Sequence, residues 1–251
     1  PKLAILRVGK NGNDISYEKS LKKKLNSFKI PYTAYEYMEN IEADVFKYEI
    51  EKLNLNDEID AIMLFRPLPD HLERENVTEA ILPDKDIDCA TLYNQGKLFA
   101  KEDCLYYPCT PMAVIDILKF YNIDMVSKNI VIAGASQVVG KPLSMMFAKE
   151  KATVTICNSK TVDMHKLTVN ADIIISAIGK AKYLTKDYFS DGQTIIDVGI
   201  NFDENGKICG DVDFENVAPK ASYITPVPGG VGPMTIAMLM EQTYQAYLNN
   251  K

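Results

Sequence analysis

The sequence predicts an α/β protein with two lobes, each built around a parallel sheet. Two observations support this fold class. Short apolar runs rich in β-branched residues alternate with segments of helical spacing along most of the chain, and one run in the second half leads through a glycine-containing turn into a helix. Strands that alternate with helices are joined by right-handed crossovers, which make them parallel. A chain of 251 residues is long enough for two small domains.

The first half contains a regular alternation of strands and helices. We expect strands at residues 2–8, 32–37 and 61–65, and helices at residues 14–28 and 43–53. The first helix carries an apolar stripe formed by Tyr17, Leu21, Leu25 and Phe28. From residue 82 to residue 107 the pattern gives way to a polar, irregular stretch. Because long loops inside compact domains are usually functional, this stretch is expected to carry site residues.

The second half is organised around residues 129–142. Residues 130–133 form a short apolar run, Gly134, Ser136 and Gly140 follow, and a helix is expected to continue to residue 149. A strand, a glycine turn and a helix present backbone N–H groups and a positive helix end to a phosphate. The spacing is G-x-S-x-x-x-G and not G-x-G-x-x-G, so the segment indicates either a dinucleotide site or an ordinary tight turn that binds nothing.

The other elements of the second half continue the alternation. A helix at residues 112–121 follows Pro108-Cys-Thr-Pro111, where we place the passage between the two domains. Further strands are expected at residues 153–157, 172–177, 193–198 and 223–225, further helices at residues 162–170 and 234–248, and a hairpin around the turn at residues 203–206.

Composition narrows the classes of function. The net charge of −6 and the pI near 5.1 argue against a nucleic-acid-binding protein. No apolar run approaches the roughly 20 residues that span a bilayer, and no secretory signal is expected. The 5 cysteines form no C-x-x-C pair, and 2 histidines allow no zinc site of recognisable spacing. We expect buried, reduced thiols, as in a cytoplasmic protein.

Five segments together resemble the methylenetetrahydrofolate dehydrogenase/cyclohydrolase family, in this order and over residues 3–243. They are Pro67-Leu-Pro69, Asp84-Lys-Asp-Ile-Asp88, Pro108-Cys-Thr-Pro111, the run GASQVVGKP from Gly134 to Pro142, and Pro226-Val-Pro-Gly-Gly-Val-Gly-Pro-Met-Thr235. The last of these is highly specific. Members of the family also carry an N-terminal segment with a helix ahead of the first strand, which is not part of this sequence.

The resemblance implies a catalytic domain, residues 1–110 and 236–251, and a Rossmann-like NAD(P)-binding domain, residues 111–235. The closing helix would return to the first lobe, and a folate cleft would lie between the lobes. The implied reaction is oxidation of 5,10-methylene-tetrahydrofolate to the methenyl form, with hydride transfer to a nicotinamide. Homodimers through the cofactor lobes are usual for relatives.

By resemblance, Tyr17 and Asp88 are the catalytic and folate-binding side chains, and Pro228, Gly229 and Gly230 also bind the folate. A tyrosine that faces a cleft can stack on a ligand ring, although Tyr17 could equally be a core aromatic residue. Asp88 can accept two N–H bonds from the pterin head, although on its residue type alone it would be a solvated loop acid. The two glycines let backbone approach a flat ligand. Cys89 stands where relatives usually have glycine.

The cofactor site is expected to use residues of the glycine turn, of the end of the following strand and of a later loop: Gly134, Ala135, Ser136, Val138, Val139, Gly140, Asn158, Ser159 and Ile200. NAD-binding Rossmann folds usually place an acid about 20 residues after the glycine turn. Residues 157–161 contain none. Their hydroxyls, amide and lysine favour NADP over NAD, with Ser159 contacting the 2′-phosphate.

Two positions predict weak or absent cyclohydrolase activity. Bifunctional relatives carry a lysine four residues after the helix tyrosine and a glutamine two residues before the P-L-P segment. Here these positions hold Leu21 and Phe65. Leucine and phenylalanine cannot activate water or move protons. A bifunctional enzyme and a non-catalytic folate- or nucleotide-binding regulator stay open. A dehydrogenase of small hydroxy or keto acids is less well supported, because no arginine or histidine pair is placed to clamp a carboxylate.

Overall fold

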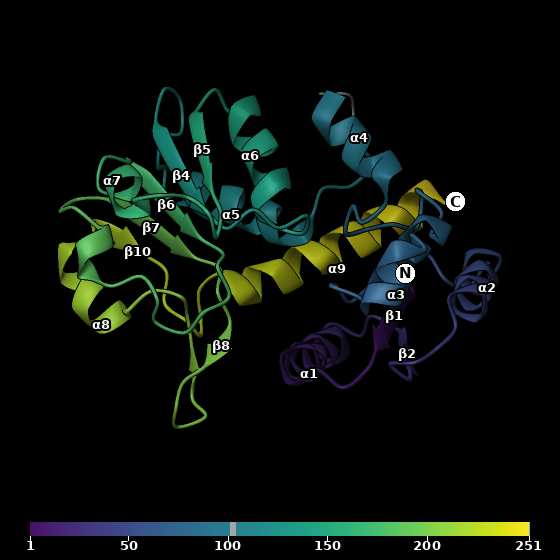
Figure 1. Ribbon diagram of the computed structural model, residues 1–251. Coiled ribbons are helices and arrows are strands. Elements are labelled where there is room, and N and C mark those ends of the chain that lie inside the picture. Colours follow the sequence, from purple (N-terminus) through teal and green to yellow (C-terminus); the bar gives the residue numbers. More distant parts are fainter. Residues whose placement is uncertain (101–103, 251) are drawn as a thin grey trace. The chain divides into compact units, whose positions relative to one another are not determined.

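The computed structural model describes residues 1–100 and 104–250 of the chain. These residues form two compact units, the first made of Pro1–Cys109 with Ile236–Lys251 and the second of Thr110–Thr235. Helix α5 (Cys109–Phe120) begins at the first division, and helix α9 (Val231–Asn249) contains the second (Figure 1). Across the described ranges, no helix combines the length and the apolar character needed to cross a bilayer.

The first unit contains a three-stranded parallel sheet in the order β2-β1-β3. Its elements are β1 (Leu3–Val8), α1 (Gly12–Ser27), β2 (Tyr32–Tyr37), α2 (Ala43–Asn54), β3 (Ala61–Leu64), α3 (Asp70–Arg74), η1 (Val77–Ala80) and α4 (Leu92–Ala100). β1 is buried along its whole length because it lies between the other two strands. The alternation expected for this half is confirmed, including all three strands and both helices.

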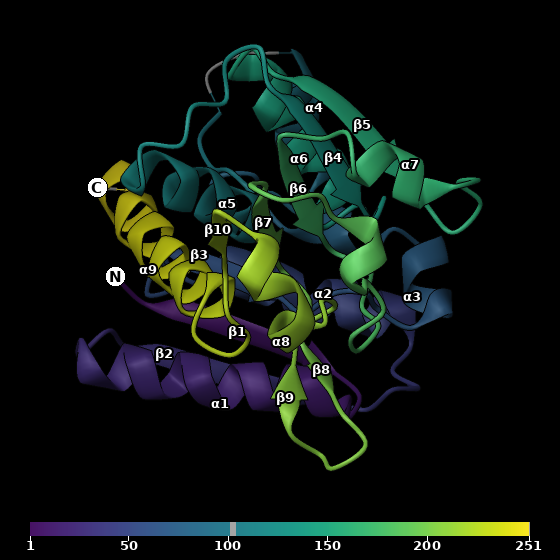
Figure 2. The ribbon, with the colours of Figure 1, turned by 90° about the vertical axis from the view of Figure 1, so that its left-hand side faces the viewer.

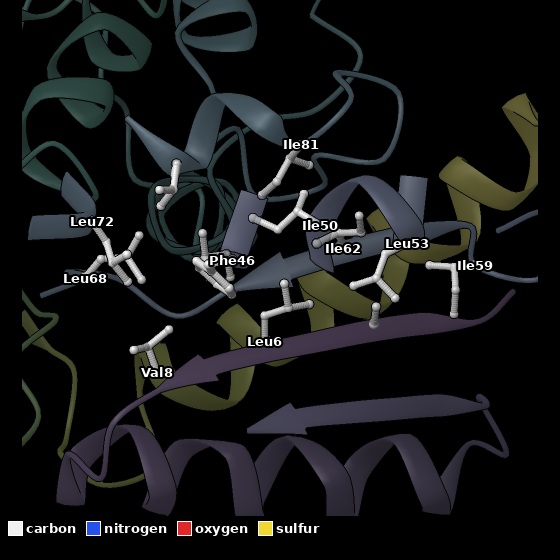
Figure 3. Packing of buried hydrophobic residues seen from close by; sticks show 13 residues of the cluster. Leu6, Val8, Phe46, Ile50, Leu53, Ile59, Ile62, Leu68, Leu72 and Ile81 are labelled. Carbon is white, nitrogen blue, oxygen red and sulfur yellow. The ribbon is translucent and has the colours of Figure 1, made fainter. Parts of the chain in front are cut away.

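The core of the first unit lies between the sheet and the segments that follow β2 and β3. Figure 3 shows Leu6 and Val8 from β1, Phe46 and Ile50 from α2, and Leu72 from α3 among side chains that point toward one another. The aromatic ring of Phe46 is fully buried. The apolar face of α2 thus covers the sheet, which leaves the loops after β1 and β3 free to carry site residues.

The expectation of an irregular stretch at residues 82–107 is wrong for residues 92–100, which form α4; residues 101–103 lie outside the described part of the chain. Hydrogen bonds to the preceding loop hold the start of this helix. The buried carboxylate of Asp86 accepts hydrogen bonds from the backbone N–H groups of Ala90 and Thr91 and from the amide of Asn94. Leu92 and Phe99 are exposed, so the apolar residues of α4 do not all lie on one buried face, and the helical pattern in the sequence is weak.

The second unit contains a five-stranded parallel sheet in the order β10-β7-β6-β4-β5. Its elements are β4 (Asn129–Ala133), α6 (Gly140–Lys149), β5 (Thr153–Cys157), α7 (Met164–Thr168), β6 (Ile173–Ser176), η2 (Lys186–Tyr188), β7 (Thr194–Asp197), α8 (Phe214–Val217), η3 (Ala218–Lys220) and β10 (Tyr223–Ile224). The predicted hairpin is also confirmed: β8 (Asn201–Phe202) and β9 (Ile208–Cys209) pair antiparallel and extend away from the sheet (Figure 2).

Two lobes with parallel sheets, one of them Rossmann-like, confirm the predicted fold class. In the second unit, β4 pairs with β5 and β6, so the carboxyl ends of β4, β5 and β6 meet at one edge of the sheet. In open α/β sheets, ligands bind outside this edge. Among the described residues, no cysteine forms a disulfide; four cysteines are buried, and Cys104 is half-buried.

Candidate active site

The segment Asp84–Asp88 divides structural and site roles among neighbouring residues. The ammonium group of Lys85 donates to the carbonyl oxygens of Leu53, Asn54 and Asn56 at 2.8–3.1 Å and so closes the carboxyl end of α2. Burial lowers the pKa of Lys85. The next acid, Asp86, holds the start of α4. The bonds of Lys85 and Asp86 thus fix the loop just before Asp88, and the side chain of Asp88 stays partly exposed.

The carboxylate of Asp88 is held by two donors and keeps acceptor capacity. Its Oδ1 accepts the backbone N–H of Cys109 at 2.9 Å, and its Oδ2 lies 3.3 Å from Nη2 of Arg66. The Asp88 side chain is 20% exposed. Because each carboxylate oxygen has two acceptor sites, one remains on each oxygen for a ligand.

Tyr17 lies close to Asp88, so the structure brings these two predicted residues together. Burial raises the pKa of the Tyr17 hydroxyl well above its usual range, and the nearby Cys109 thiol and Asp88 carboxylate raise it further. The ring meets Phe65 edge to face, with ring centroids 6.0 Å apart. Within the described chain, no group forms a hydrogen bond with the Tyr17 hydroxyl. Tyr17 is half-buried and is therefore neither a fully packed core residue nor a solvated one.

Helix α9 reaches this site through Gln242. Its Nε2 donates to the carbonyl oxygens of Ile87 (2.7 Å) and Tyr107 (2.8 Å) and to the sulfur of Cys109 (3.1 Å). Burial and the neighbouring Asp88 raise the pKa of the Cys109 thiol well above its usual range, which disfavours the reactive thiolate. The predicted return of the closing helix to the first lobe is confirmed.

The two positions that predict weak hydrolysis are apolar and packed. Leu21 is fully buried in α1, and Phe65 is 7% exposed beside Tyr17. The neighbouring Lys22 does not replace the missing lysine, because its ammonium group pairs with Glu18, which also accepts from Arg7 at 2.6 Å. Thus Lys22 is held by Glu18 and is not placed to act at the position that Leu21 occupies.

Cys89 follows the candidate ligand-binding acid and has a positive φ of 50°. Glycine adopts such a conformation without steric cost, whereas a side chain makes it less favourable. This explains why glycine suits the position in relatives. The thiol itself is buried, and burial raises its pKa above the usual range, which disfavours the reactive thiolate.

The glycine turn after β4 is closely packed. A Cβ on Gly134 (φ 133°) would overlap the carbonyl oxygen of Ala177 at the end of β6, and one on Gly140 would overlap the carbonyl oxygen of Gly134. The two glycines therefore let the turn fold tightly over the sheet. Ser136 orients the turn, because its Oγ accepts the N–H of Val139 at 3.1 Å.

This turn fits the phosphates of a dinucleotide. The backbone N–H groups of residues 135–138 donate no hydrogen bond to any described residue, and they lie next to the amino end of α6. Free N–H groups at a helix start bind anions. The predicted residues Ala135, Ser136 and Val138 belong to this free backbone, at the carboxyl edge of the sheet, whereas the N–H of Val139 is bonded to Ser136.

The end of β5 supplies a second part of the site, side by side with the glycine turn. Gly134 donates its N–H to the carbonyl oxygen of Cys157 at 3.0 Å. Asn158 closes the next turn, since its Oδ1 accepts the N–H of Lys160 at 2.8 Å. Ser159 is exposed, and its hydroxyl bonds to no described residue. Asn158 thus shapes the turn, and Ser159 is available to a ligand.

Ile200 follows β7 and is 39% exposed, on a loop that two buried aspartates fix. Asp211 accepts hydrogen bonds from Ser176, Asn201 and the backbone N–H groups of residues 178–180. Asp197 accepts the N–H groups of Gly199, Asp211 and Val212. Sequence reasoning missed both aspartates, because the acids lie far apart in the sequence and show no motif of known spacing.

The last predicted group belongs to the second unit. Pro228, Gly229 and Gly230 follow β10, the Val227–Pro228 peptide is cis, and Gly229 has a φ of 108°. A Cβ on Gly230 would crowd the carbonyl oxygen of Pro226. These glycines are required by the turn itself. Sequence reasoning also missed Arg66, whose only signal was a charged residue directly before Pro67.

Comparison with known proteins finds two domain models of one family along the chain. The family model for the tetrahydrofolate dehydrogenase/cyclohydrolase catalytic domain matches residues 1–88, and the model for the NAD(P)-binding domain of the same family matches residues 108–251. The bifunctional protein FolD of Clostridium botulinum is 48% identical over 250 residues, which cover 100% of this chain and 89% of that protein.

Solved structures give the same result. The chain is similar to the bifunctional FolD dehydrogenase/cyclohydrolase of Campylobacter jejuni, with a TM-score of 0.94, 43% identity, and coverage of 100% of this chain and 89% of that one. It is also similar to the Trypanosoma brucei FolD complexed with NADP and an inhibitor, with a TM-score of 0.93, 30% identity, and coverage of 99% and 87%. The site geometry, the domain models and these relatives together show that the chain belongs to the tetrahydrofolate dehydrogenase/cyclohydrolase family.

Proposed function

We propose that this protein oxidises 5,10-methylene-tetrahydrofolate to 5,10-methenyl-tetrahydrofolate with NADP, and that it hydrolyses the methenyl product weakly or not at all. The observation that carries the proposal is the pairing of Tyr17 and Asp88 beside two apolar side chains, Leu21 and Phe65. The first unit would bind the folate and the second the dinucleotide.

The first unit has the groups that a pterin needs. Asp88 keeps one acceptor site on each oxygen, which suits the paired N–H donors of the pterin head. Tyr17 offers a half-buried ring for stacking. Pro228, Gly229 and Gly230 are the proposed contacts from the second unit.

Hydride transfer needs alignment more than it needs a protein base. The methenyl product is a cation shared by two ring nitrogens, so the substrate itself supplies the electrons that expel the hydride. When bound, the nicotinamide accepts this hydride. The chain contributes positioning, through Asp88 at the pterin and the rigid turns at the cofactor.

Hydrolysis has a different requirement. Water must be activated and protons moved at the methenyl carbon, and loss of a general acid–base group typically costs about 10²–10⁴-fold in rate. At the two relevant positions, Leu21 and Phe65 offer no polar atom. Burial keeps Tyr17 protonated, so its hydroxyl is a poor base.

NADP is the proposed cofactor because of the turn after β5. Its exposed residues are Asn158, Ser159 and Lys160, and none is an acid that would repel a 2′-phosphate. The free hydroxyl of Ser159 can donate to that phosphate, and Lys160 adds a positive charge nearby. Steady-state rates with both dinucleotides test this choice; a lower KM for NAD than for NADP contradicts it.

One assay tests the reaction. Methenyl-tetrahydrofolate absorbance is followed during cofactor reduction, and methenyl-tetrahydrofolate is then supplied directly. We expect accumulation in the first case and decay at the buffer rate in the second. Decay well above the buffer rate supports the bifunctional alternative, which the names of the relatives favour; folate binding without cofactor reduction supports a regulator.

A variant that restores the polar pair sharpens this test. We expect Leu21→Lys with Phe65→Gln to raise hydrolysis above the buffer rate, whereas either change alone leaves the pair incomplete. Because Leu21 is fully buried, circular dichroism must first show that the double variant is folded. The matched control is Lys24→Gln, an exposed change on the same helix.

We also propose a homodimer through the second unit. β5 is an edge strand, and Ile156 on it and Val162 after it are 36% and 82% exposed. An unpaired apolar strand edge is suited to a second copy of the chain. Light scattering after gel filtration should give twice the mass of the chain; a monomer mass at assay concentration contradicts the proposal.

A further inference from the structure

Arg66 is the charged group nearest to the proposed pterin acid. It follows β3 directly, its side chain is 9% exposed, and its Nη2 lies 3.3 Å from Oδ2 of Asp88. Among the described residues, Asp88 is the only carboxylate within ion-pair distance of Arg66. An arginine this deeply buried loses much of its hydration, so contacts with the protein fix the orientation of its guanidinium group.

The two hydrogen bonds that Asp88 accepts differ in length. The backbone N–H of Cys109 is fixed to Oδ1 at 2.9 Å, whereas the contact with Arg66 is longer than the 2.7–2.9 Å usual for a charge-assisted bond. A guanidinium has five N–H donors, and only one is used in this contact. Arg66 therefore keeps donors for a second acceptor placed beside Asp88.

Together, Asp88 and Arg66 offer a ligand two acceptors followed by a donor. A 2-amino-4-oxo-pyrimidine ring has the complementary edge: an exocyclic amino donor, a ring N–H donor and a carbonyl acceptor. A 2,4-diamino ring has an unprotonated ring nitrogen at the second position and an amino donor at the third, so Asp88 loses one N–H partner and Arg66 faces another donor. Leaving a buried polar group unpaired is the strongest route to discrimination between ligands.

We propose that Arg66 is a specificity-determining residue of the folate site, which selects the 4-oxo form of the pterin over the 4-amino form by donating to the 4-oxygen. This inference rests on the proposed function, because it needs a folate at Asp88. It adds a contact that neither Tyr17 nor Asp88 supplies.

Calorimetric titration tests the inference with two probes, tetrahydrofolate and its 4-amino-4-deoxy analogue. We expect the wild-type protein to bind the 4-oxo compound about 10–100-fold more tightly, the range for one hydrogen bond to a charged group. Arg66→Met should reduce this preference by at least about threefold, mainly by weakening the 4-oxo compound, and the part of the preference that arises at Asp88 should remain. Arg66→Lys, which keeps a charge and a donor, should restore part of it.

Controls separate this role from a structural one. Arg74→Met changes an exposed arginine of α3 and should keep the wild-type preference. The KM for NADP should be unchanged in all variants, and Arg66→Gln provides a folded variant with a neutral donor if Arg66→Met does not fold. An unchanged preference in Arg66→Met, or in Arg66→Gln where that variant takes its place, overturns the inference. A wild-type protein that binds neither probe contradicts the proposed function instead.

Discussion

At the residue scale, the candidate site depends on a few side chains whose roles differ although they are close in sequence. Lys85, Asp86 and Asp88 are charged residues of one loop. The first two already form hydrogen bonds at helix ends, Lys85 at the carboxyl end of α2 and Asp86 at the start of α4. Only Asp88 retains open acceptor sites. The function of a charged loop residue thus follows from which of its neighbours already hold structural bonds.

Asp88→Asn tests the pterin contact. The amide replaces one acceptor with a donor, which would face an N–H of the pterin, so we expect the KM for the folate to rise about 10–100-fold, as for loss of a charged hydrogen bond. The KM for NADP should stay near the wild-type value. The matched control is Asp84→Asn, an exposed acid of the same loop. Equal effects of the two changes would argue against a folate at Asp88.

Tyr17→Phe tests whether the ring or the hydroxyl matters. Because burial raises the pKa of Tyr17 well above its usual range, the hydroxyl remains protonated up to at least pH 10. We expect kcat/KM for the dehydrogenase to change less than about tenfold in the phenylalanine variant, which keeps the stacking surface. Its pH profile from 6 to 10 should match that of the wild type. Loss of an ionisation in the variant would assign a proton-transfer role to Tyr17.

At the element scale, the loops after β6 and β7 are fixed by two buried carboxylates. A Cβ on Gly199 would overlap the Asp211 carboxylate, and one on Gly210 would overlap that of Asp197. The glycines thus let each acid approach the backbone that it holds. The hydrogen bonds to these two carboxylates hold the backbone of the loops in place, which a cofactor site requires.

This pair predicts a pH-dependent stability. Burial, with the charge of Asp211 adding to it, raises the pKa of Asp197 to about 7, although three backbone N–H donors act in the opposite direction. Between about pH 4 and pH 7 the unfolded chain has lost this proton and the folded chain keeps it. The contribution of Asp197 to stability therefore falls as the pH rises through this window and is constant above it.

Asp197→Asn should flatten this dependence, since an amide does not ionise. We expect the free energy of unfolding, from urea titrations between pH 4 and pH 8, to fall less steeply with pH in the variant than in the wild type. Its absolute value should be lower at every pH, because the amide group would face the N–H of Val212. Asp187→Asn, an exposed acid in η2, is the control. Parallel curves for wild type and variant would refute the assignment.

At the scale of the whole molecule, the first unit is closed by a segment from the far end of the chain. Gln242 on α9 connects residues that are 133–155 positions earlier in the sequence. Its amide is buried and makes bonds with both its donor and acceptor atoms. The site at Asp88 therefore depends on a helix that lies more than 130 residues later in the sequence.

Gln242→Leu tests this closure. The change removes the three hydrogen bonds that the Gln242 amide makes with the backbone of Ile87 and Tyr107, and each such bond contributes about 1 kcal/mol. We expect the free energy of unfolding to fall by about 3 kcal/mol, measured with urea. The exposed Gln137→Leu is the matched control. A loss below about 1 kcal/mol would show that α9 is held by apolar packing alone.

The sequence by itself determined the parallel α/β architecture, the glycine turn, the hairpin and the family. These features are encoded locally: the periodicity of apolar residues follows the period of each element, and glycine is required where backbone comes close to backbone. Motifs such as the segment from Pro226 to Thr235 identify a family because close packing permits few alternatives.

Only the tertiary structure decided which residues meet. α4 forms because Asp86 supplies its first bonds, although its apolar residues show no stripe. The contacts of Arg66 with Asp88 and of Phe65 with Tyr17 join positions 22 and 48 residues apart, a separation that carries no periodic signal. Burial and contact between distant segments depend on how the elements pack, and this packing sets the chemistry of the site.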